Sequence, residues 1–263
     1  GSGKSVTSNA ILRLLPDTAQ ISGEIILNPQ GEDPLNITSL DERDPRMQNL
    51  RGGLVSMVFQ EPMTALSPVH RIGDQVAEAV LCHRDVSPEV AMAEAATMLE
   101  QVGLTEVDKK IRMYPFEFSG GMRQRVVIAM ALICHPQLLI CDEPTTALDV
   151  TIQAEILVLI KSLQRKLNNS VLFITHDLGV VAQIADRVVV MYDGQVMESG
   201  SVRQVLKNPQ HPYTRHLLAS IPGAVTDSGS QLHAANWSDG APIGAGTFLA
   251  DAEEGRQVRE FSQ

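Results

Sequence analysis

The stretch FSGGMRQRVVIAMALICHPQLLICDEPTTALD, residues 118–149, decides the fold of this chain. Residues 119–121 place glycine amides at the start of an apolar helix, which is a geometry suited to binding an anion. An apolar strand follows over residues 138–142 and ends in the paired acids Asp142 and Glu143. Parallel α/β sheets bind ligands beyond the carboxyl ends of their strands, so the stretch predicts a phosphate-binding α/β protein.

The composition describes a globular chain with room for one catalytic unit and an attached module. It has 263 residues, of which 44% are hydrophobic, and a mean hydropathy of zero. The longest wholly apolar run, residues 126–134, is too short to cross a bilayer. A formal net charge of -10 repels polyphosphate backbones, which argues against nucleic acid as the main partner.

The three cysteines indicate the redox setting. Cys82, Cys134 and Cys141 form neither an even set nor a C-x-x-C motif, which favours a reducing, cytosolic setting over a secreted one. His135 beside Cys134 raises the question of a metal site, but buried cysteine in an apolar helix and strand is the simpler interpretation.

Hydrophobic periodicity predicts strands that alternate with helices. A helical insertion is expected over residues 72–103, with its best helix capped by Ser87 and stopped by Gly103. The alternation predicts a mostly parallel sheet with helices on both faces and a small β-rich edge near residues 22–36. Strands are expected over residues 22–27, 54–59, 138–142, 171–175 and 187–192, and other helices over residues 1–15, 152–167 and 201–207.

The first five residues, GSGKS, match the end of the phosphate-binding loop G-x-x-x-x-G-K-[ST]. In that loop Lys4 would reach the β and γ phosphates and the Ser5 hydroxyl would bind Mg2+. An N-terminal Gly-Ser-Gly is also what a cloning remnant looks like. The helix that starts after Ser5 and the later motifs favour the phosphate loop. The expected phosphate-binding set is Gly1, Ser2, Gly3, Lys4, Ser5 and Val6.

These motifs together resemble the ABC ATPase family, whose signature sequence matches residues 119–124 and whose Walker B strand matches residues 138–143. The resemblance implies a P-loop NTPase fold of the RecA-like kind, with a mostly parallel sheet flanked by helices, an antiparallel β edge and an inserted α-helical subdomain. It implies ATP and Mg2+ as cofactors. The expected domains are an ATP-binding core at residues 1–66 and 119–200, a helical subdomain at 67–118 and a C-terminal extension at 201–263.

The resemblance also assigns roles to polar side chains at strand ends. Glu143 would be the general base that polarises the attacking water, and Asp142 would hold Mg2+, usually through water. Gln60 would contact Mg2+ or water, His176 would contact the γ phosphate, and Asp149 would lie in a loop that crosses to a partner subunit. Each residue alone is more often an ordinary polar side chain, whereas their order and spacing together are specific.

The signature implies a second ATPase subunit or domain. In the family these residues complete the site of the partner, so two ATP molecules are sandwiched in a head-to-tail dimer. Met122 replaces the commoner glutamine, and the form SGGMRQR is associated with peptide importers. The signature set comprises Ser119, Gly120, Gly121, Met122 and Gln124.

Three further stretches resemble the ATPases of oligopeptide, dipeptide, nickel and glutathione importers: FQEPMTALSPV, EPTTALDVTIQAEIL and NPQHPYTRHLLASIP. The implied protein is an ATP-hydrolysing subunit on the cytoplasmic face of the membrane. Its implied partners are two transmembrane permease subunits, docked near residues 60–71 and the helical insertion, and indirectly an extracytoplasmic solute-binding protein. No nucleic acid is expected, and the transported solute is not predicted.

Two alternatives remain beside this interpretation. A soluble ABC mechanoenzyme acting on DNA or ribosomes is disfavoured by the acidic charge and by the absence of long heptad repeats. A catalytically dead nucleotide sensor is disfavoured by Glu143 and His176. Because the sequence begins inside the phosphate-loop motif, we expect a fragment of a longer protein that binds ATP poorly.

Overall fold

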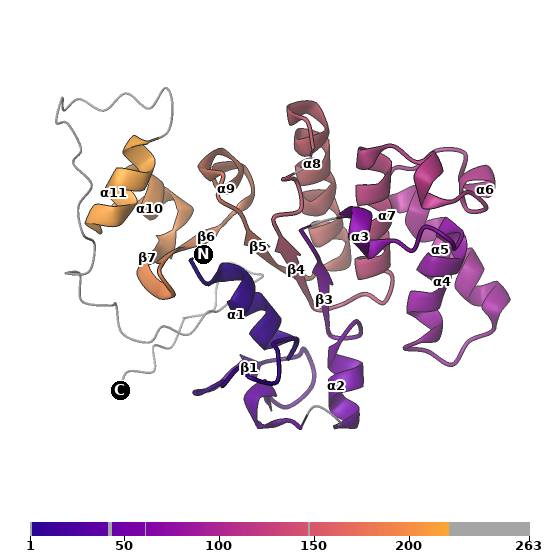
Figure 1. Ribbon diagram of the computed structural model, residues 1–263, viewed down its shortest axis with the longest axis horizontal. Helices are drawn as coiled ribbons and strands as arrows, with labels where there is room; N and C mark the ends of the chain where they lie inside the picture. The colour runs from indigo at the N-terminus through magenta and orange to yellow at the C-terminus, as the bar shows by residue number, and fades with distance from the viewer. Residues whose placement is uncertain (1, 42–43, 61, 147, 221–263) are drawn as a thin grey trace. The chain divides into compact units, whose positions relative to one another are not determined.

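The computed structural model describes residues 2–41, 44–60, 62–146 and 148–220 (Figure 1). Two of the predicted features, Gly1 and the tail beyond Pro222, lie outside the described residues. The described chain forms two compact units, one of residues 8–174 and a smaller one of residues 2–7 and 175–220. Within these ranges no helix is both long enough and apolar enough to span a membrane.

The centre of the larger unit is a three-stranded parallel sheet with the order β3-β4-β5. The strands are β3 (Val55–Val58), β4 (Leu138–Asp142) and β5 (Ser170–Ile174). Leu138 pairs with both Val55 and Ser170, so the strands run in step and their carboxyl ends meet at one edge. Four of the five residues of β4 are buried, as expected for the middle strand of a covered parallel sheet. The predicted parallel sheet is confirmed.

Two long helices connect these strands. The helix α7 (Gly120–Leu132) leads into β4, and α8 (Val150–Leu167) leads from β4 to β5. Because α7 lies against β3 as well as against the helices α4 and α5, it is buried around most of its circumference (Figure 1).

The predicted helical insertion contains only helices between residues 67 and 118, all of which are described. They are α4 (Ile72–Leu81), α5 (Pro88–Gln101), α6 (Val107–Lys110) and a 3-10 turn (Pro115–Glu117), preceded by the short α3 (Pro62–Ala65). The predicted cap of α5 is confirmed, since the Ser87 side chain accepts a hydrogen bond from the Val90 amide at 3.4 Å.

A small antiparallel edge precedes the sheet, as predicted, but its first strand is shorter than the predicted 22–27. It pairs β1 (Ile26–Leu27) with β2 (Leu35–Asn36), and a 3-10 turn (Ile37–Ser39) and α2 (Pro45–Leu50) follow. The helix α1 (Lys4–Ile11) is shorter than the predicted 1–15. The apolar side chains of this region join those of the sheet in one buried cluster of Leu12, Ile37, Leu40, Met47, Leu50, Val55, Ile140 and Ile174.

The described part of the smaller unit is the first turn of α1 together with a β-hairpin and three further helices. It contains α9 (Leu178–Ile184), β6 (Arg187–Tyr192), β7 (Gln195–Ser201), α10 (Val202–Lys207) and α11 (Pro212–Ala219). The predicted strand at 187–192 exists, but its implied place in the parallel set is wrong, because β6 pairs antiparallel with β7. Asp193 and Gly194 have positive φ angles of 46° and 75°, which is what a tight two-residue hairpin turn requires.

Candidate functional site

The carboxyl end of β4 carries the two predicted acids. Asp142 is 5% exposed, and its Oδ1 atom has no hydrogen-bond partner within the described residues. Glu143 has a φ angle of +47°, a left-handed conformation that costs a non-glycine residue on the order of 1–3 kcal/mol. Its amide donates a hydrogen bond to the Ile174 carbonyl at 2.9 Å, which ties the turn to the end of β5. Backbone strain of this kind concentrates at functional sites.

The Glu143 carboxylate accepts hydrogen bonds from Gln60 and Thr146. Gln60 Nε2, just beyond β3, donates to Glu143 Oε2 at 3.3 Å, and Thr146 Oγ1 donates to the same oxygen at 2.9 Å. The fold thus brings Gln60 and Glu143 together across 83 positions of sequence, as their expected roles require. Thr146 was not singled out from the sequence; its position three residues after Glu143, in the turn beyond the strand, was the available signal.

The oxygen atoms at this edge fit a magnesium ion. No group of three His, Cys, Asp or Glu side chains able to hold a metal occurs among the described residues. Mg2+ is commonly bound through one or two carboxylates, with water and substrate phosphates supplying the remaining ligands. The buried, unpaired Oδ1 of Asp142 suits that chemistry, and Gln60, which bonds to the adjacent Glu143, follows the neighbouring strand β3. The third predicted ligand, Ser5, is exposed and belongs to the smaller unit.

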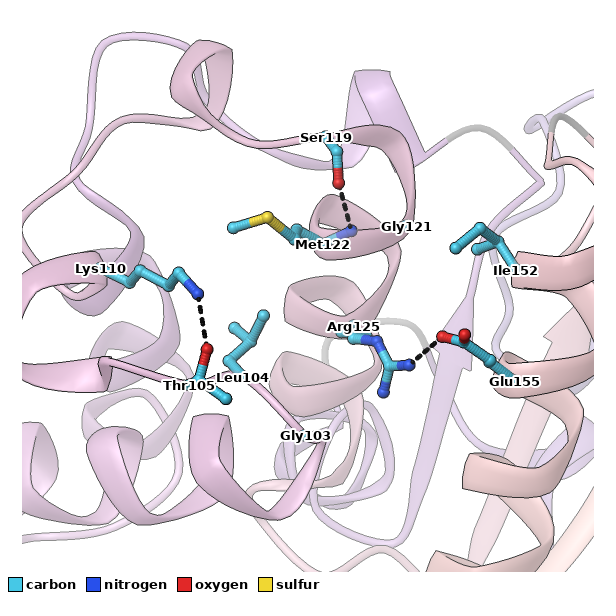
Figure 2. Close-up of a pocket in the computed structure, with 10 residues that line it drawn as sticks. All are labelled: Gly103, Leu104, Thr105, Lys110, Ser119, Gly121, Met122, Arg125, Ile152 and Glu155. Atoms are coloured by element: carbon cyan, nitrogen blue, oxygen red, sulfur yellow. Dashed lines mark hydrogen bonds and ion pairs between the residues drawn. The ribbon is translucent and has the colours of Figure 1, made fainter.

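The signature residues lie at the start of α7. Ser119 is exposed and caps the helix by accepting a hydrogen bond from the Met122 amide at 3.3 Å (Figure 2). Gly120, Gly121 and Met122 are partly accessible. Gln124 differs, since it is fully buried and neither polar atom of its amide has a partner within the described chain. Four of the five predicted residues are thus accessible to a ligand from outside.

Asp149 begins the next helix. Its side chain accepts a hydrogen bond from the Ile152 amide at 3.0 Å and so caps α8, which starts at Val150, two residues before the predicted position. The residue is exposed, so capping leaves part of its surface open to a partner.

The described residues of the phosphate-loop match lie in the smaller unit. Gly3 has a φ angle of +86°, and a side chain there would bring a Cβ atom to 3.2 Å from the Cα atom of Gly194. Lys4 Nζ donates to Ser2 Oγ at 2.8 Å, while Ser5 and Val6 are exposed. The glycine is therefore required by both backbone conformation and close approach.

His176 belongs to the same unit. It is exposed and directly precedes Asp177, which caps α9 by accepting a hydrogen bond from the Gly179 amide at 2.8 Å. The candidate residues therefore divide between the units. Gln60, Asp142, Glu143, Asp149 and the signature belong to the larger one, and Ser2–Val6 with His176 to the smaller one.

The cysteines take no part in this site. Cys141 is fully buried within β4, and burial raises the pKa of its thiol well above the ordinary value. Cys134 donates from Sγ to the Ala79 carbonyl at 3.3 Å, and burial likewise raises its pKa. Both shifts favour the unreactive thiol, which agrees with a structural role.

Comparison with known proteins decides the family. A family model described as ABC transporter matches residues 1–146, more than half of the chain. The chain belongs to the ABC transporter family. A second model, described as the oligopeptide/dipeptide transporter C-terminal region, matches residues 197–238. The resemblance predicted from the sequence is confirmed, and the nucleic-acid alternative is not supported.

Two relatives within the ABC transporter family are similar to this chain over most of its length. It is 51% identical over 236 residues to the oligopeptide transport ATP-binding protein OppD of Bacillus subtilis, with 89% of this chain covered. It is 51% identical over 224 residues to the glutathione import ATP-binding protein GsiA of Escherichia coli K12, with 84% of this chain covered. The chain spans 64% of the length of the first relative and 36% of the second.

Solved structures confirm the fold. The ATP-binding cassette MJ0796, in a dimeric post-hydrolysis state bound to ADP and Pi, matches with a TM-score of 0.64 and 28% identity. Another dimeric structure of MJ0796, titled a bacterial ABC transporter cassette, matches with the same TM-score and 29% identity. Each match covers 77% of this chain and 82% of the other. The predicted P-loop NTPase fold is therefore confirmed.

Proposed function

We propose that this chain is the ATP-hydrolysing subunit of an ABC importer for small peptides or related solutes. The observation that carries the proposal is the Glu143 carboxylate, held in a left-handed turn by Gln60 and Thr146 next to the buried Asp142. The names of OppD and GsiA, an oligopeptide transporter and a glutathione importer, support the solute class.

The proposed reaction is the transfer of the γ-phosphoryl group of ATP to water. Glu143 accepts a proton from the water while the water oxygen bonds to the γ phosphorus. The bond between the γ phosphorus and the bridging β–γ oxygen breaks, giving ADP and phosphate. The hydrogen bonds from Gln60 and Thr146 orient one carboxylate oxygen, Oε2. His176 contacts the γ phosphate in this proposal.

The remaining candidate residues bind the nucleotide. Lys4 would contact the phosphates together with backbone amides of the phosphate loop. Mg2+ would be held by Ser5, Gln60 and Asp142 and would neutralise charge on the phosphates. The phosphate-binding residues are taken to be Gly1, Ser2, Gly3, Lys4, Ser5 and Val6.

A partner chain would complete each site. The accessible Ser119, Gly120, Gly121 and Met122 would bind the ATP of the partner, and Asp149 would contact it. The dimeric state of MJ0796 with ADP and Pi supports this arrangement. Two permease subunits and an external solute-binding protein would complete the importer at the cytoplasmic face of the membrane.

Uptake into membrane vesicles that contain the permease subunits tests the proposal. Glu143→Gln should lower phosphate release and ATP-driven peptide uptake at least about 100-fold while ATP still binds, because the general base is lost. Glu100→Gln, an exposed position on α5, makes the same chemical change away from the site and should have no effect. Unchanged uptake by the Glu143 variant, or copurification with nucleic acid rather than membrane proteins, would refute the proposal.

A further inference from the structure

Arg125 joins three segments of the larger unit. It lies one turn after Gly121 on α7. Its Nη1 donates to the carbonyl of Val102, the C-cap residue of α5, at 2.7 Å. Its Nη2 pairs with Glu155 Oε2 on α8 at 2.8 Å, the ion pair that Figure 2 shows. The Arg125 side chain is 18% exposed and the Glu155 side chain 51% exposed, so the bond to Val102 is partly buried while the ion pair is open to water. One guanidinium thus links the helical insertion, the signature helix and α8.

The backbone around Arg125 is shaped to admit the guanidinium. Gly103 follows Val102 with a φ angle of +83°, and a Cβ atom there would lie 2.9 Å from Arg125 Nη1. The carbonyl end of α5 carries partial negative charge, which favours a cation at this point. Both the space and the electrostatic environment therefore favour the arginine side chain.

A second contact joins α7 to α8 one turn away. A Cβ atom at Gly121 would lie 2.8 Å from Ile152 Cγ2, so the start of α7 packs closely on the first turn of α8. The pairs Gly121–Ile152 and Arg125–Glu155 are spaced by four residues on α7 and three on α8, as neighbours on one helix face are. The same four residues line an open surface pocket of about 280 Å³, together with Thr105, Lys110 and Ser119 among others (Figure 2).

These contacts connect two segments that face the same partner. The signature opens α7, and Asp149 caps α8, so whatever fixes one helix against the other also fixes the signature relative to Asp149. We propose that Arg125 is a positioning residue that holds the signature and the Asp149 loop in register for the partner subunit. The inference rests on the proposed function, in which that partner carries ATP.

Lysine at position 125 should not reproduce the function of the arginine. A single ammonium group lacks the planar fork that reaches the Val102 carbonyl and the Glu155 carboxylate together. In dimerisation and in hydrogen exchange, Arg125→Lys should therefore give values between those of the parent and those of Arg125→Met. The methionine variant keeps the aliphatic stem and removes both bonds. Arg84→Met is the matched control, because Arg84 pairs with Glu94 at 2.6 Å within the helical insertion, away from the signature helix.

The test uses two readouts in a Glu143→Gln background. The first is the ATP concentration that gives half-maximal dimer by light scattering, which should rise about tenfold or more for Arg125→Met. The second, without nucleotide, is hydrogen exchange at residues 103–105 and 120–123, which should quicken in Arg125→Met only. Binding of a fluorescent ATP analogue to the single chain should change less than about twofold, since Arg125 lies at the signature and not at the phosphate loop.

The outcomes separate this inference from the proposed function. If the parent dimerises with ATP and Arg125→Met does so at the same concentration, the inference is overturned, whatever the exchange result, and the proposed function stands. If the parent does not dimerise, the proposed function loses its partner site, and hydrogen exchange then tests the positioning role of Arg125. Faster exchange confined to the joint then supports the positioning role, and exchange equal to that of Arg84→Met overturns it.

Discussion

Replacing Glu198 by glutamine should loosen the last described helix, α11, from the hairpin. Glu198 lies in β7, is 7% exposed, and accepts hydrogen bonds from the amides of Gln210 at 2.8 Å and His211 at 3.1 Å. His211 is the N-cap of α11, so one carboxylate fixes the entry to that helix. The tilted ring contact between Tyr213 and Tyr192, with ring centroids 4.7 Å apart, would still retain part of the attachment.

The magnitude follows from the two hydrogen bonds. A hydrogen bond to a charged group contributes about 1.5–3 kcal/mol, and a neutral one about 0.5–1.5. Glutamine keeps one acceptor oxygen and loses the charge, so the local stability of α11 should fall by about 2–4 kcal/mol. At 1.4 kcal/mol per factor of ten, exchange of the α11 amides should quicken roughly 30- to 1000-fold.

The effect should depend on pH with a definite sign. Burial acts to raise the pKa of the Glu198 carboxyl, but the Gln210 amide, the Thr214 hydroxyl and the His211 amide together outweigh it and hold the pKa below its ordinary value of 4.5. A carboxyl with a lowered folded pKa stabilises the fold fully above its unfolded value and loses that contribution as the pH falls through the folded value. The native α11 should therefore approach the behaviour of the variant only below about pH 4.5.

Hydrogen exchange by mass spectrometry of a peptide covering residues 212–219 is the assay. A peptide from α8 serves as the internal reference, and Glu100→Gln serves as the control variant. Exchange in the Glu198 variant within twofold of the native chain would refute the reasoning, as would native α11 exchange that shows no acid-induced loss of protection.

Three further predictions concern the site and the core. Thr146→Val should lower the turnover of ATP about tenfold and leave the KM for ATP within about twofold, because the hydrogen bond that orients the Glu143 carboxylate is lost. Thr146→Ser should restore the turnover, and an unaltered turnover of Thr146→Val in phosphate-release assays would contradict this. Leu99→Ala, at a fully buried position of α5, should lower the free energy of unfolding by about 2–5 kcal/mol in urea titrations, and the exposed Val90→Ala should cost far less; equal costs would be inconsistent with the core described. Chelation of divalent cations should stop phosphate release, added Mg2+ should restore it, and Asp142→Asn should need more Mg2+ for the same rate; full activity in chelator would exclude the metal role of Asp142.

Local signals predicted the parts of the fold that depend on short sequence windows. The apolar run of β4, the Ser87 cap and the acids at 142 and 143 are all set by neighbouring residues, and the structure has them where they were expected. The pairing of β6 was misjudged because strands separated by helices suggest parallel neighbours. The Asp193–Gly194 turn, a local hairpin signal, carried the correct information.

The features that were missed depend on long-range contacts or unusual chemistry. No periodicity reveals that Glu198 turns inward to hold two amides 12 and 13 residues away. A histidine cap such as His211 is not among the common helix-start residues, which left α11 without a predicted beginning. Gln124 is predicted in the signature set that meets the ATP of the partner, yet its helix is covered on most sides and buries it.

The identity of the nucleotide retained by Glu143→Gln tests the central claim most directly. Protein incubated with Mg2+ and ATP labelled on the α phosphate is freed of unbound nucleotide, and the bound label is resolved into ATP and ADP over a single turnover. The account predicts that the native chain converts bound ATP to ADP while the variant retains ATP at least about 100 times longer. Conversion by the variant at the native rate would contradict the assignment of Glu143 as the base.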